Sequence, residues 1–330
     1  MIREGIINIY KEQNMTSHDV VGRVRRIVRK KRVGHTGTLD PMATGVLPVC
    51  VGSATRIMEY LDLDLKRYRC RMQLGLSTDT YDIWGKTFVR SSPRAVDRVT
   101  EEDVRAVLST FTGSIEQTPP MYSALKVNGK RLYEYAREGK TVEVKSRRVC
   151  IPELEIEELR LGRGLASTVT FSLQCTKGTY IRSICHDAGE MLGVHAVMSG
   201  LVRTESGIWD LEHAWTLDQL ASMREDELNA VIGDPDRALT HFGEILLSEE
   251  DGARFANGQR ISGKSLSIAR LPEFKDRDFY MPVNEEYRNM YLVYSGSGGG
   301  EKRFRGTAVL DPVKRSIRPK KVFVSGNGGF

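Results

Sequence analysis

The chain has 330 residues, of which 40% are hydrophobic and 28% charged, and its formal net charge at pH 7 is +6. These values are typical of a soluble globular protein, and the length favours two domains. No run approaches the roughly 20 apolar residues of a transmembrane helix, and the N-terminus lacks the apolar core of a signal peptide. We therefore expect a cytoplasmic protein with no membrane association.

The sequence lacks the usual patterns of zinc and nucleotide-cofactor sites. No Cys-x-x-Cys or closely spaced His pair occurs, which argues against zinc, and neither a Walker sequence nor a dinucleotide fingerprint is present. An odd number of widely spaced cysteines indicates reduced, buried thiols. The five cysteines are Cys50, Cys70, Cys150, Cys175 and Cys185.

The first expected elements are a strand over residues 5–10 and a helix over about residues 16–31. A capping residue and apolar residues at helical spacing predict the helix. Residues 22–32 carry seven positive charges and no negative one. A solvated helix face and a phosphate-binding face explain this pattern equally well by themselves, and the position just before the loop described next favours phosphate binding.

That loop, GHTGTLDPMATGVL over residues 34–47, holds a single carboxylate, Asp40. It is rich in Gly, Thr and Pro, and no second acid or metal-ligand pattern accompanies it. Judged alone, Asp40 is better explained as a residue that caps a helix or closes a turn before Pro41.

Further along, we expect a strand over residues 66–75, a capped helix ending at Gly113, and a hairpin at Asn128-Gly129. Basic residues alternate with tyrosines around the hairpin. This composition suits an arm that binds nucleic acid, although ordinary surface hairpins share it. The basic residues are Lys126, Lys130, Arg131, Arg137 and Lys140.

A strand, a turn and a helix from about Tyr180 follow. His186 and Asp187 are neighbours on this helix and point in different directions, so we do not expect a catalytic dyad. After residue 240 short strands predominate, with a second hairpin signal at Asn257-Gly258 and a loop at residues 295–300.

The last thirty residues carry eight positive and two negative charges. Together with the basic segment near the N-terminus they form two separate basic regions. Two such regions favour a nucleic-acid partner more than the net charge does.

Four sequence blocks, in order, resemble the TruB-type tRNA pseudouridine synthases. They are RVGHTGTLDPMATGVLPV, KRYRCRMQLGLSTDTYD, TPPMYSALKVNGKRLYEYAREG and CTKGTYIRS. The resemblance runs over about residues 5–215. The tail resembles a PUA-type RNA-binding module more faintly, through FANGQRI and its strand pattern.

The resemblance implies an α/β (α+β) pseudouridine synthase fold, a mixed and largely antiparallel sheet flanked by helices. It places a catalytic domain over residues 1–240, with a thumb-like insertion at about 118–145, and a PUA-like domain over residues 241–330. It also implies that the protein needs no metal and no cofactor. We expect it to act as a monomer.

The implied reaction converts the uridine at position 55 in the T-loop of tRNA into pseudouridine. By resemblance, Asp40 is the nucleophile, Arg182 pairs with it, and Tyr68 stacks on the base and handles the proton at C5. One carboxylate suffices for the attack, because an unperturbed aspartate ionises near pH ~3.9. A phenol with a pKa of about 10 is a poor base, so Tyr68 needs a shifted pKa or a relayed proton.

The uridine must leave its stack before it can react. The resemblance assigns Tyr180 and Leu201 to the nucleotide pocket and His35 to the space in the refolded T-loop. It also assigns four basic residues to the thumb-like insertion that closes on the RNA: Lys126, Lys130, Arg131 and Arg137.

Two alternatives remain. One is a related synthase that modifies another RNA, such as ribosomal RNA within a guide-RNA particle, and the insertion argues against it. The other is a catalytically idle RNA-binding or RNA-folding protein on the same scaffold, and the presence of Asp40, Tyr68 and Arg182 argues against that. The chain departs from the family pattern at residues 11–17, KEQNMTS, and at Ile83-Trp84.

Overall fold

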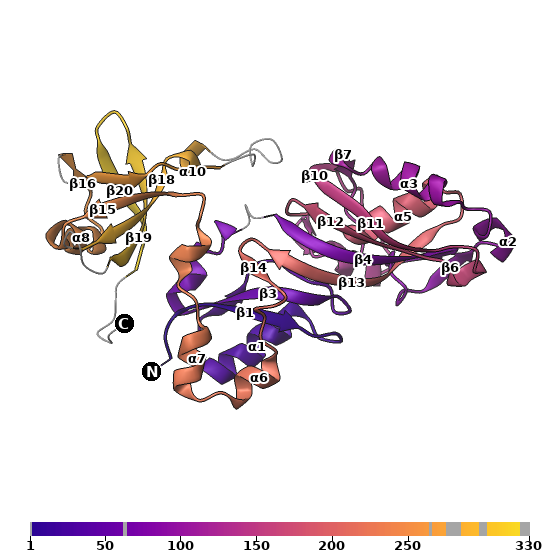
Figure 1. Ribbon diagram of the computed structural model, residues 1–330, viewed down its shortest axis with the longest axis horizontal. Coiled ribbons are helices and arrows are strands. Elements are labelled where there is room, and N and C mark those ends of the chain that lie inside the picture. Colours follow the sequence, from indigo (N-terminus) through magenta and orange to yellow (C-terminus); the bar gives the residue numbers. More distant parts are fainter. Residues whose placement is uncertain (1, 62–64, 264–265, 275–284, 297–301, 324–330) are drawn as a thin grey trace.

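Two β-sheets organise the chain (Figure 1): a main sheet built within residues 5–210 and a second sheet within residues 243–322. The main sheet extends toward one end of the molecule, and the second sheet lies at the other. The structure, a computed structural model, describes residues 2–61, 65–263, 266–274, 285–296 and 302–323.

The main sheet has the strand order β1-β3-β13-β4-β12-β11, with β2 paired to β3 and β14 paired to β13. Neighbouring strands are antiparallel except β13 and β3, which run parallel. The prediction of a mixed, largely antiparallel sheet is confirmed. The strands are β1 (Gly5–Lys11), β2 (Val33–His35), β3 (Thr44–Val51), β4 (Lys66–Leu74), β11 (Glu153–Arg160), β12 (Thr168–Cys175), β13 (Ala196–Ser206) and β14 (Trp209–Asp210).

Strand β4 shows how the sequence pattern builds this sheet. Tyr68, Cys70 and Met72 are buried, whereas the alternate residues Arg69 and Arg71 are exposed. Successive side chains of a strand point to opposite faces, so one face joins the core and the other meets solvent. The predicted strand at this position is confirmed.

Helix α1 (Ser17–Val28) begins with a capping box, in which the side chains of Thr16 and Asp19 each accept from the other's backbone N–H. Its valines form the buried face. The helix ends where Arg29 adopts a left-handed conformation, with φ of 52°. The predicted end near residue 31 is therefore wrong, and the last basic residues lie outside the helix.

The other helices cover the main sheet at two places. Helices α1, α6 and α7 lie together near β1 and β3, and α2, α3 and α5 lie toward the far end (Figure 1). The predicted helices before Gly113 and after Tyr180 are confirmed as α3 and α5. The remaining elements are η1 (Gly52–Ile57), β5 (Leu76–Thr78), β6 (Thr87–Arg90), α2 (Pro93–Val96), α3 (Glu101–Ser109), β7 (Gly113–Gln117), β10 (Arg147–Ile151), η3 (Gly164–Ala166), α5 (Ile181–Met191), α6 (Leu217–Ser222), α7 (Glu225–Val231) and η4 (Pro235–Ala238).

The insertion contains a small hairpin followed by a helix. Strands β8 (Lys126–Val127) and β9 (Lys130–Arg131) flank Asn128 and Gly129, whose φ angles are 52° and 81°. Both central residues thus have positive φ, as a two-residue hairpin turn requires, and the prediction is confirmed. Helix α4 (Leu132–Arg137) follows directly.

The second sheet has the order β16-β20-β19-β18-β15-β17. The hairpin predicted at Asn257-Gly258 is wrong, because Asn257 instead ends helix α8. The loop predicted at residues 295–300 lies mostly outside the described residues. The elements are β15 (Gly243–Leu247), α8 (Glu249–Ala256), β16 (Ile261–Ser262), β17 (Ser267–Arg270), α10 (Glu285–Arg288), β18 (Met290–Ser295), β19 (Arg303–Asp311) and β20 (Ser316–Val322).

A hydrophobic cluster joins the two sheets. Ile57 and Tyr60, from the segment after β3, belong to the same buried cluster as Phe242 and Leu292. We propose the domain boundary near residue 240, where the chain passes from the main sheet into the second. Among the helices that the structure describes, none combines the length and apolar character needed to span a bilayer.

Candidate active site

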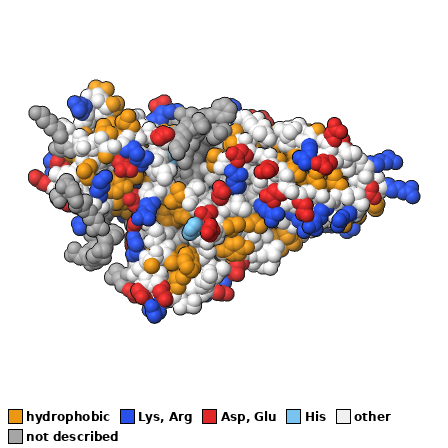
Figure 2. All heavy atoms as spheres, viewed as in Figure 1, with side chains coloured by type: hydrophobic (Ala, Val, Ile, Leu, Met, Phe, Trp, Pro, Cys, Tyr) orange, Lys and Arg blue, Asp and Glu red, His pale blue; other side chains and the backbone are white. Residues whose placement is uncertain are grey.

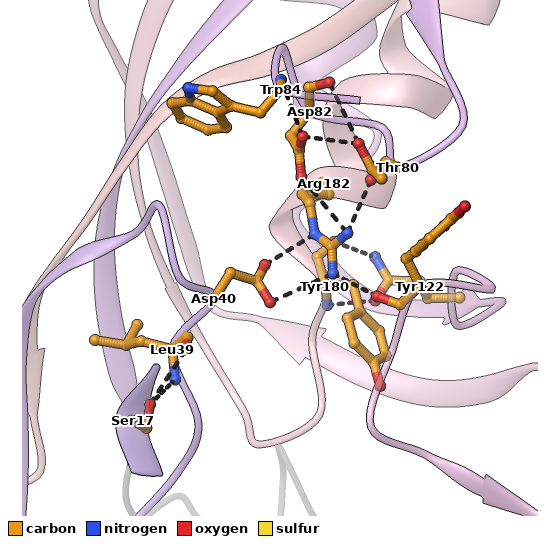
Figure 3. Close-up of polar contacts among 10 residues, drawn as sticks. Ser17, Leu39, Asp40, Thr80, Asp82, Trp84, Tyr122, Tyr180 and Arg182 are labelled. Atoms are coloured by element: carbon orange, nitrogen blue, oxygen red, sulfur yellow. Dashed lines mark hydrogen bonds and ion pairs between the residues drawn. The ribbon is translucent and has the colours of Figure 1, made fainter. Parts of the chain in front are cut away.

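Asp40 lies in the loop between β2 and β3 and faces Arg182, the second residue of α5. The Nε of Arg182 is 2.9 Å from Oδ2 of Asp40, and Nη2 is 3.4 Å from Oδ1 (Figure 3). The arginine side chain is 6% exposed and the aspartate side chain 39%. The guanidinium thus fixes the carboxylate in a two-point contact while leaving part of it open to solvent.

Arg182 is itself held by two loops. Its Nη1 donates to the carbonyl of Thr80 at 2.8 Å, and its Nη2 donates to the carbonyl of Tyr122 at 2.9 Å. Tyr122 lies near the start of the insertion, so Arg182 links α5, the loop after β5 and the base of the insertion. Since both carbonyls are fixed by the backbone, the guanidinium has little freedom to turn away from Asp40.

A second carboxylate, Asp82, also faces Arg182, with Oδ2 3.7 Å from Nη1. Burial raises the pKa of Asp82 above its ordinary value, while a hydrogen bond from the Thr80 hydroxyl and the charge of Arg182 oppose the shift. The idea of an isolated acid therefore holds along the sequence but not in space. The block KRYRCRMQLGLSTDTYD ends with Asp82, so the second acid was already contained in a motif that carries the resemblance.

The loop that carries Asp40 is anchored to α1 and closed by a turn of its own. The Ser17 hydroxyl accepts from the backbone N–H of Leu39 at 2.9 Å and donates to its carbonyl at 3.1 Å (Figure 3). The Ala43 N–H donates to the carbonyl of Asp40 at 3.1 Å and closes a turn. Asp40 therefore closes that turn through its backbone, whereas its side chain contacts Arg182.

Lys11, which the sequence analysis did not single out, binds the same loop through its side chain. It is fully buried, and its Nζ donates to the carbonyls of Ala43 at 2.6 Å and Pro41 at 3.1 Å. Burial lowers the pKa of Lys11 to about 8, with Asp40 opposing the shift. The departure from the family pattern after this residue leaves the lysine and its contacts in place.

Arg203 is a further buried cation that the sequence analysis missed. It lies on β13 directly opposite Tyr68 on β4, donates from Nε to the carbonyl of Val46 at 2.6 Å, and donates from Nη2 to Gly37 at 3.3 Å. A β-carbon on Gly45 would lie 2.2 Å from the carbonyl oxygen of Arg203, which explains a glycine there. No local pattern marks Arg203, because its partners lie far away in the sequence.

Tyr68 is 8% exposed and lies in the main core. Burial raises the pKa of its phenol, the charge of Asp40 acts in the same direction, and contact with Arg203 opposes the shift. The structure thus brings together three predicted residues, Asp40, Tyr68 and Arg182, around one loop.

The other predicted pocket residues lie on elements next to this group. Tyr180 immediately precedes α5, and its backbone exchanges two hydrogen bonds with the Gln117 side chain. Leu201 is 8% exposed and lies opposite Cys70 in the sheet. His35 ends β2 and is half-buried, and burial lowers its pKa, which favours the neutral imidazole at pH 7.

The predicted basic residues of the insertion contact their own neighbours. Lys130 forms an ion pair with Glu138, Arg131 donates to the Tyr133 hydroxyl at 2.9 Å, and the Arg137 guanidinium lies 5.3 Å from the Tyr133 ring centre. Lys126 is exposed on β8. These side chains are available at the surface and lie some distance along the chain from Asp40.

The basic segment at α1 is partly paired within the protein. Arg23 forms an ion pair with Asp218 at 2.7 Å, and Lys30 pairs with Glu4 at 3.1 Å. Lys31 and Arg32 line a surface cavity of about 430 Å³. On the face drawn in Figure 2, positive and negative side chains are intermixed over the main sheet, so the net charge does not form one continuous patch there.

The five cysteines are unpaired and buried, as predicted. Within the described ranges, no group of three or more His, Cys, Asp or Glu side chains is arranged to hold a metal ion.

Family models match two consecutive segments. Residues 25–181 match the N-terminal domain of the TruB family of pseudouridylate synthases, and residues 182–240 match the C-terminal domain of tRNA pseudouridylate synthase B. The tRNA pseudouridine synthase B of Clostridium tetani is 41% identical over 282 residues, which cover 86% of this chain and 92% of the relative. That of Clostridioides difficile is 44% identical over 264 residues, covering 78% and 84%.

Solved structures share the fold at lower identity. A Cbf5–Nop10–Gar1 complex aligns with a TM-score of 0.70 and 24% identity, covering 97% of this chain and 85% of that chain. An archaeal box H/ACA Nop10–Cbf5 complex gives 0.69 and 23%, covering 98% and 87%. The resemblance found in the sequence is thus confirmed: this chain belongs to the TruB family of pseudouridylate synthases, isomerases that act on RNA.

Proposed function

We propose that this chain converts the uridine at position 55 in the T-loop of tRNA into pseudouridine, with Asp40 as the nucleophile. The observation that supports this most is the contact between Asp40 and buried Arg182, which orients a carboxylate whose side chain stays 39% exposed. A nucleophile must be fixed and reachable, and this geometry supports both requirements. The names of the most similar relatives point to the same substrate.

The reaction breaks the bond between N1 of the base and C1′ of the ribose, turns the base, and joins C5 to C1′. Asp40 attacks either C6 of the base or C1′ of the sugar, and Arg182 orients the carboxylate. After the new bond forms, the proton on C5 must leave. Tyr68 is the group proposed for this step, and because burial raises its pKa despite the opposing charge of adjacent Arg203, it would pass the proton on by a relay rather than act as a standing phenolate.

Reaching Asp40 requires the uridine to be extruded from its stack, at a cost of a few kcal/mol. In the proposal Tyr68 stacks on the extruded base, Tyr180 and Leu201 line its pocket, and His35 fills the space it leaves. The neutral imidazole favoured by burial suits a position between bases.

The thumb-like insertion, residues 118–145 and called the arm from here on, closes on the T-arm of the RNA. The chain acts as a monomer without metal or cofactor. Recognition rests on the folded shape of the T-arm and on phosphate contacts, as is usual for structured RNA. The second sheet, in the PUA-like region 241–330, adds a further RNA-binding surface. The basic residues assigned to the arm are Lys126, Lys130, Arg131 and Arg137.

The test is to incubate the protein with an unmodified tRNA transcript and to map pseudouridine by carbodiimide probing. Product at the T-loop uridine, absent with Asp40→Asn, is the expected result. Tight binding without product would instead identify an idle RNA-binding protein. Product that forms only in another RNA would reject the proposed substrate while keeping the chemistry.

A further inference from the structure

Exposed apolar side chains gather on the segment between β5 and the end of β6. Ile83 is 36% exposed, Trp84 41%, Phe88 65% and Val89 42%. Large aromatic side chains usually bury 150–250 Å² each, so an indole left this open forgoes a large gain in stability. The exposure of Trp84 therefore needs an explanation, and its position beside Asp82 suggests a role in binding.

Trp84 is tied to the active site by its backbone. Its N–H donates to Oδ1 of Asp82 at 3.1 Å, and the other oxygen of Asp82 faces Arg182, which holds Asp40. Two contacts thus separate the tryptophan backbone from the Asp40–Arg182 pair. In the view of Figure 3, the indole extends away from this network on the same side as the Asp40 carboxylate.

The turn that carries Trp84 is fixed independently of the ring. The Ile83 N–H donates to the carbonyl of Met198 at 2.9 Å, and the Met198 N–H donates to the carbonyl of Tyr81 at 3.0 Å, so the turn is joined to β13. A β-carbon on Gly85 would lie 2.2 Å from the Thr80 hydroxyl oxygen, which shows how closely the turn is packed. The backbone at Trp84 is thus held in place while 41% of the residue stays exposed.

Two hydrogen-bonded acids and two exposed cations lie around the turn. Both nearby acids have protein donors: Asp79 accepts from the backbone N–H of Lys86 at 2.7 Å and from the Tyr122 hydroxyl at 3.3 Å, and Asp82 accepts from Thr80 and Trp84. The side chains of Lys86 and Arg90, in contrast, are exposed. An apolar protein partner would be expected to cover all the open side chains, whereas a nucleobase needs the indole alone.

We propose that Trp84 is a stacking platform for a nucleobase next to the target uridine in the bound RNA. The inference rests on the proposed function, since a uridine that reaches Asp40 brings its flanking nucleotides with it, and Asp82 links the turn that carries Trp84 to Arg182. Base–aromatic stacking contributes about 1–3 kcal/mol per base and accepts any base, because every base has a π-face. Trp84 thereby adds affinity at a position where no hydrogen-bond readout is needed.

The first experiment measures turnover of a T-arm hairpin. With Trp84→Ala, KM should rise about 5- to 100-fold with kcat changed little, and Trp84→Phe should restore most of the loss, because phenyl still stacks. Phe88→Ala is the matched control: it removes a more exposed aromatic ring from the same hairpin that lacks the contact with Asp82, and KM should not change. Equal losses in Trp84→Ala and Phe88→Ala, or none in Trp84→Ala, would overturn the proposal.

The second experiment locates the base and does not depend on turnover. Abasic sites are introduced one at a time beside the target uridine, and binding is measured in the Asp40→Asn background. One abasic position should weaken binding to the protein with Trp84 but not to Trp84→Ala, which is the non-additivity expected for two groups in contact. RNA should also quench tryptophan fluorescence less in Trp84→Phe. Additive losses at every position would refute stacking, whereas absence of product with the wild-type protein would refute the proposed function itself.

Discussion

Two groups of cations in this molecule are held in opposite ways. In the aspartate cluster, defined as Lys11, Asp40, Asp82, Arg182 and Arg203, the cations are buried and their partners lie mostly far away in the sequence. In the arm, the cations lie at the surface and contact residues within eight positions of themselves. The cluster is therefore organised before RNA arrives, whereas the arm can exchange its local contacts for phosphates.

The largest effect is expected from Asp40→Asn. Asparagine has nearly the same shape and can still contact Arg182, but it cannot act as a carboxylate nucleophile, so turnover should fall by about 10³-fold or more. Pseudouridine formation in single-turnover reactions with tRNA transcript measures this. Binding affinity and its salt dependence should stay close to wild type.

If Asp40→Asn lost binding in parallel with turnover, Asp40 would serve RNA docking or folding of the loop. The proposed division between a catalytic aspartate cluster and an RNA-binding arm would then be wrong. A thermal unfolding measurement separates these cases, because a misfolded loop lowers the unfolding temperature.

The next effect concerns stability. Arg203→Met would remove the donor to the buried carbonyl of Val46 and to the partly buried carbonyl of Gly37, and a buried group left without its donor costs about 1–3 kcal/mol. We expect the free energy of unfolding in urea to fall by about 2–5 kcal/mol. Arg131→Met in the arm is the matched control and should change it by less than about 0.5 kcal/mol. Similar losses in both variants would show that burial does not distinguish the two groups.

Much of the fold could be predicted from sequence because its signals are local. The alternation along β4, the capping box before α1 and the Asn128-Gly129 turn each depend on a few adjacent residues. Where a local signal is ambiguous, prediction fails. The Asn257-Gly258 pair predicts a hairpin, but Asn-Gly also occurs at the C-terminal ends of helices, and here it ends α8. The basic residues after Val28 continue a helical pattern, but α1 stops at Arg29, which has a left-handed conformation.

The aspartate cluster was only partly predictable, for a different reason. Asp40, Tyr68 and Arg182 came from motif resemblance, whereas the contacts of Lys11, Asp82 and Arg203 are visible only in the structure. Arg182 and Asp40 are 142 positions apart, and no local pattern encodes which buried polar groups will meet across a sheet. The need to satisfy every buried donor, a property of the whole fold, selects those partners.

A pH titration offers a third test of the cluster. Lys11 has a pKa of about 8 in the folded protein against 10.5 as its ordinary value. Between these pH values the unfolded chain binds more protons than the folded one, so the free energy of unfolding should rise with pH, by up to about 3 kcal/mol. Urea unfolding of wild type and Lys11→Met at several pH values isolates this term as their difference. A difference that stays constant from pH 8 to 10.5 would contradict the assignment to Lys11.

The smallest effect is expected in the arm. Arg137 contacts the Tyr133 ring and has no carboxylate partner within the described part of the chain. If Arg137 neutralises one phosphate, Arg137→Gln should reduce the slope of log affinity against log salt by about 0.7–0.9, so its binding defect should shrink as salt is raised.

Glu138→Gln sharpens the same test with the opposite sign. Glu138 pairs with Lys130 and Lys140, so its neutralisation frees both cations for RNA. Affinity for the T-arm hairpin should then increase at low salt, and the slope should steepen. Because exposed pairs contribute only about 0.2–1 kcal/mol, the gain should stay within about fivefold. If neither variant changed the salt dependence of binding relative to wild type, the arm would position RNA by its shape, and its charges would stabilise the arm itself.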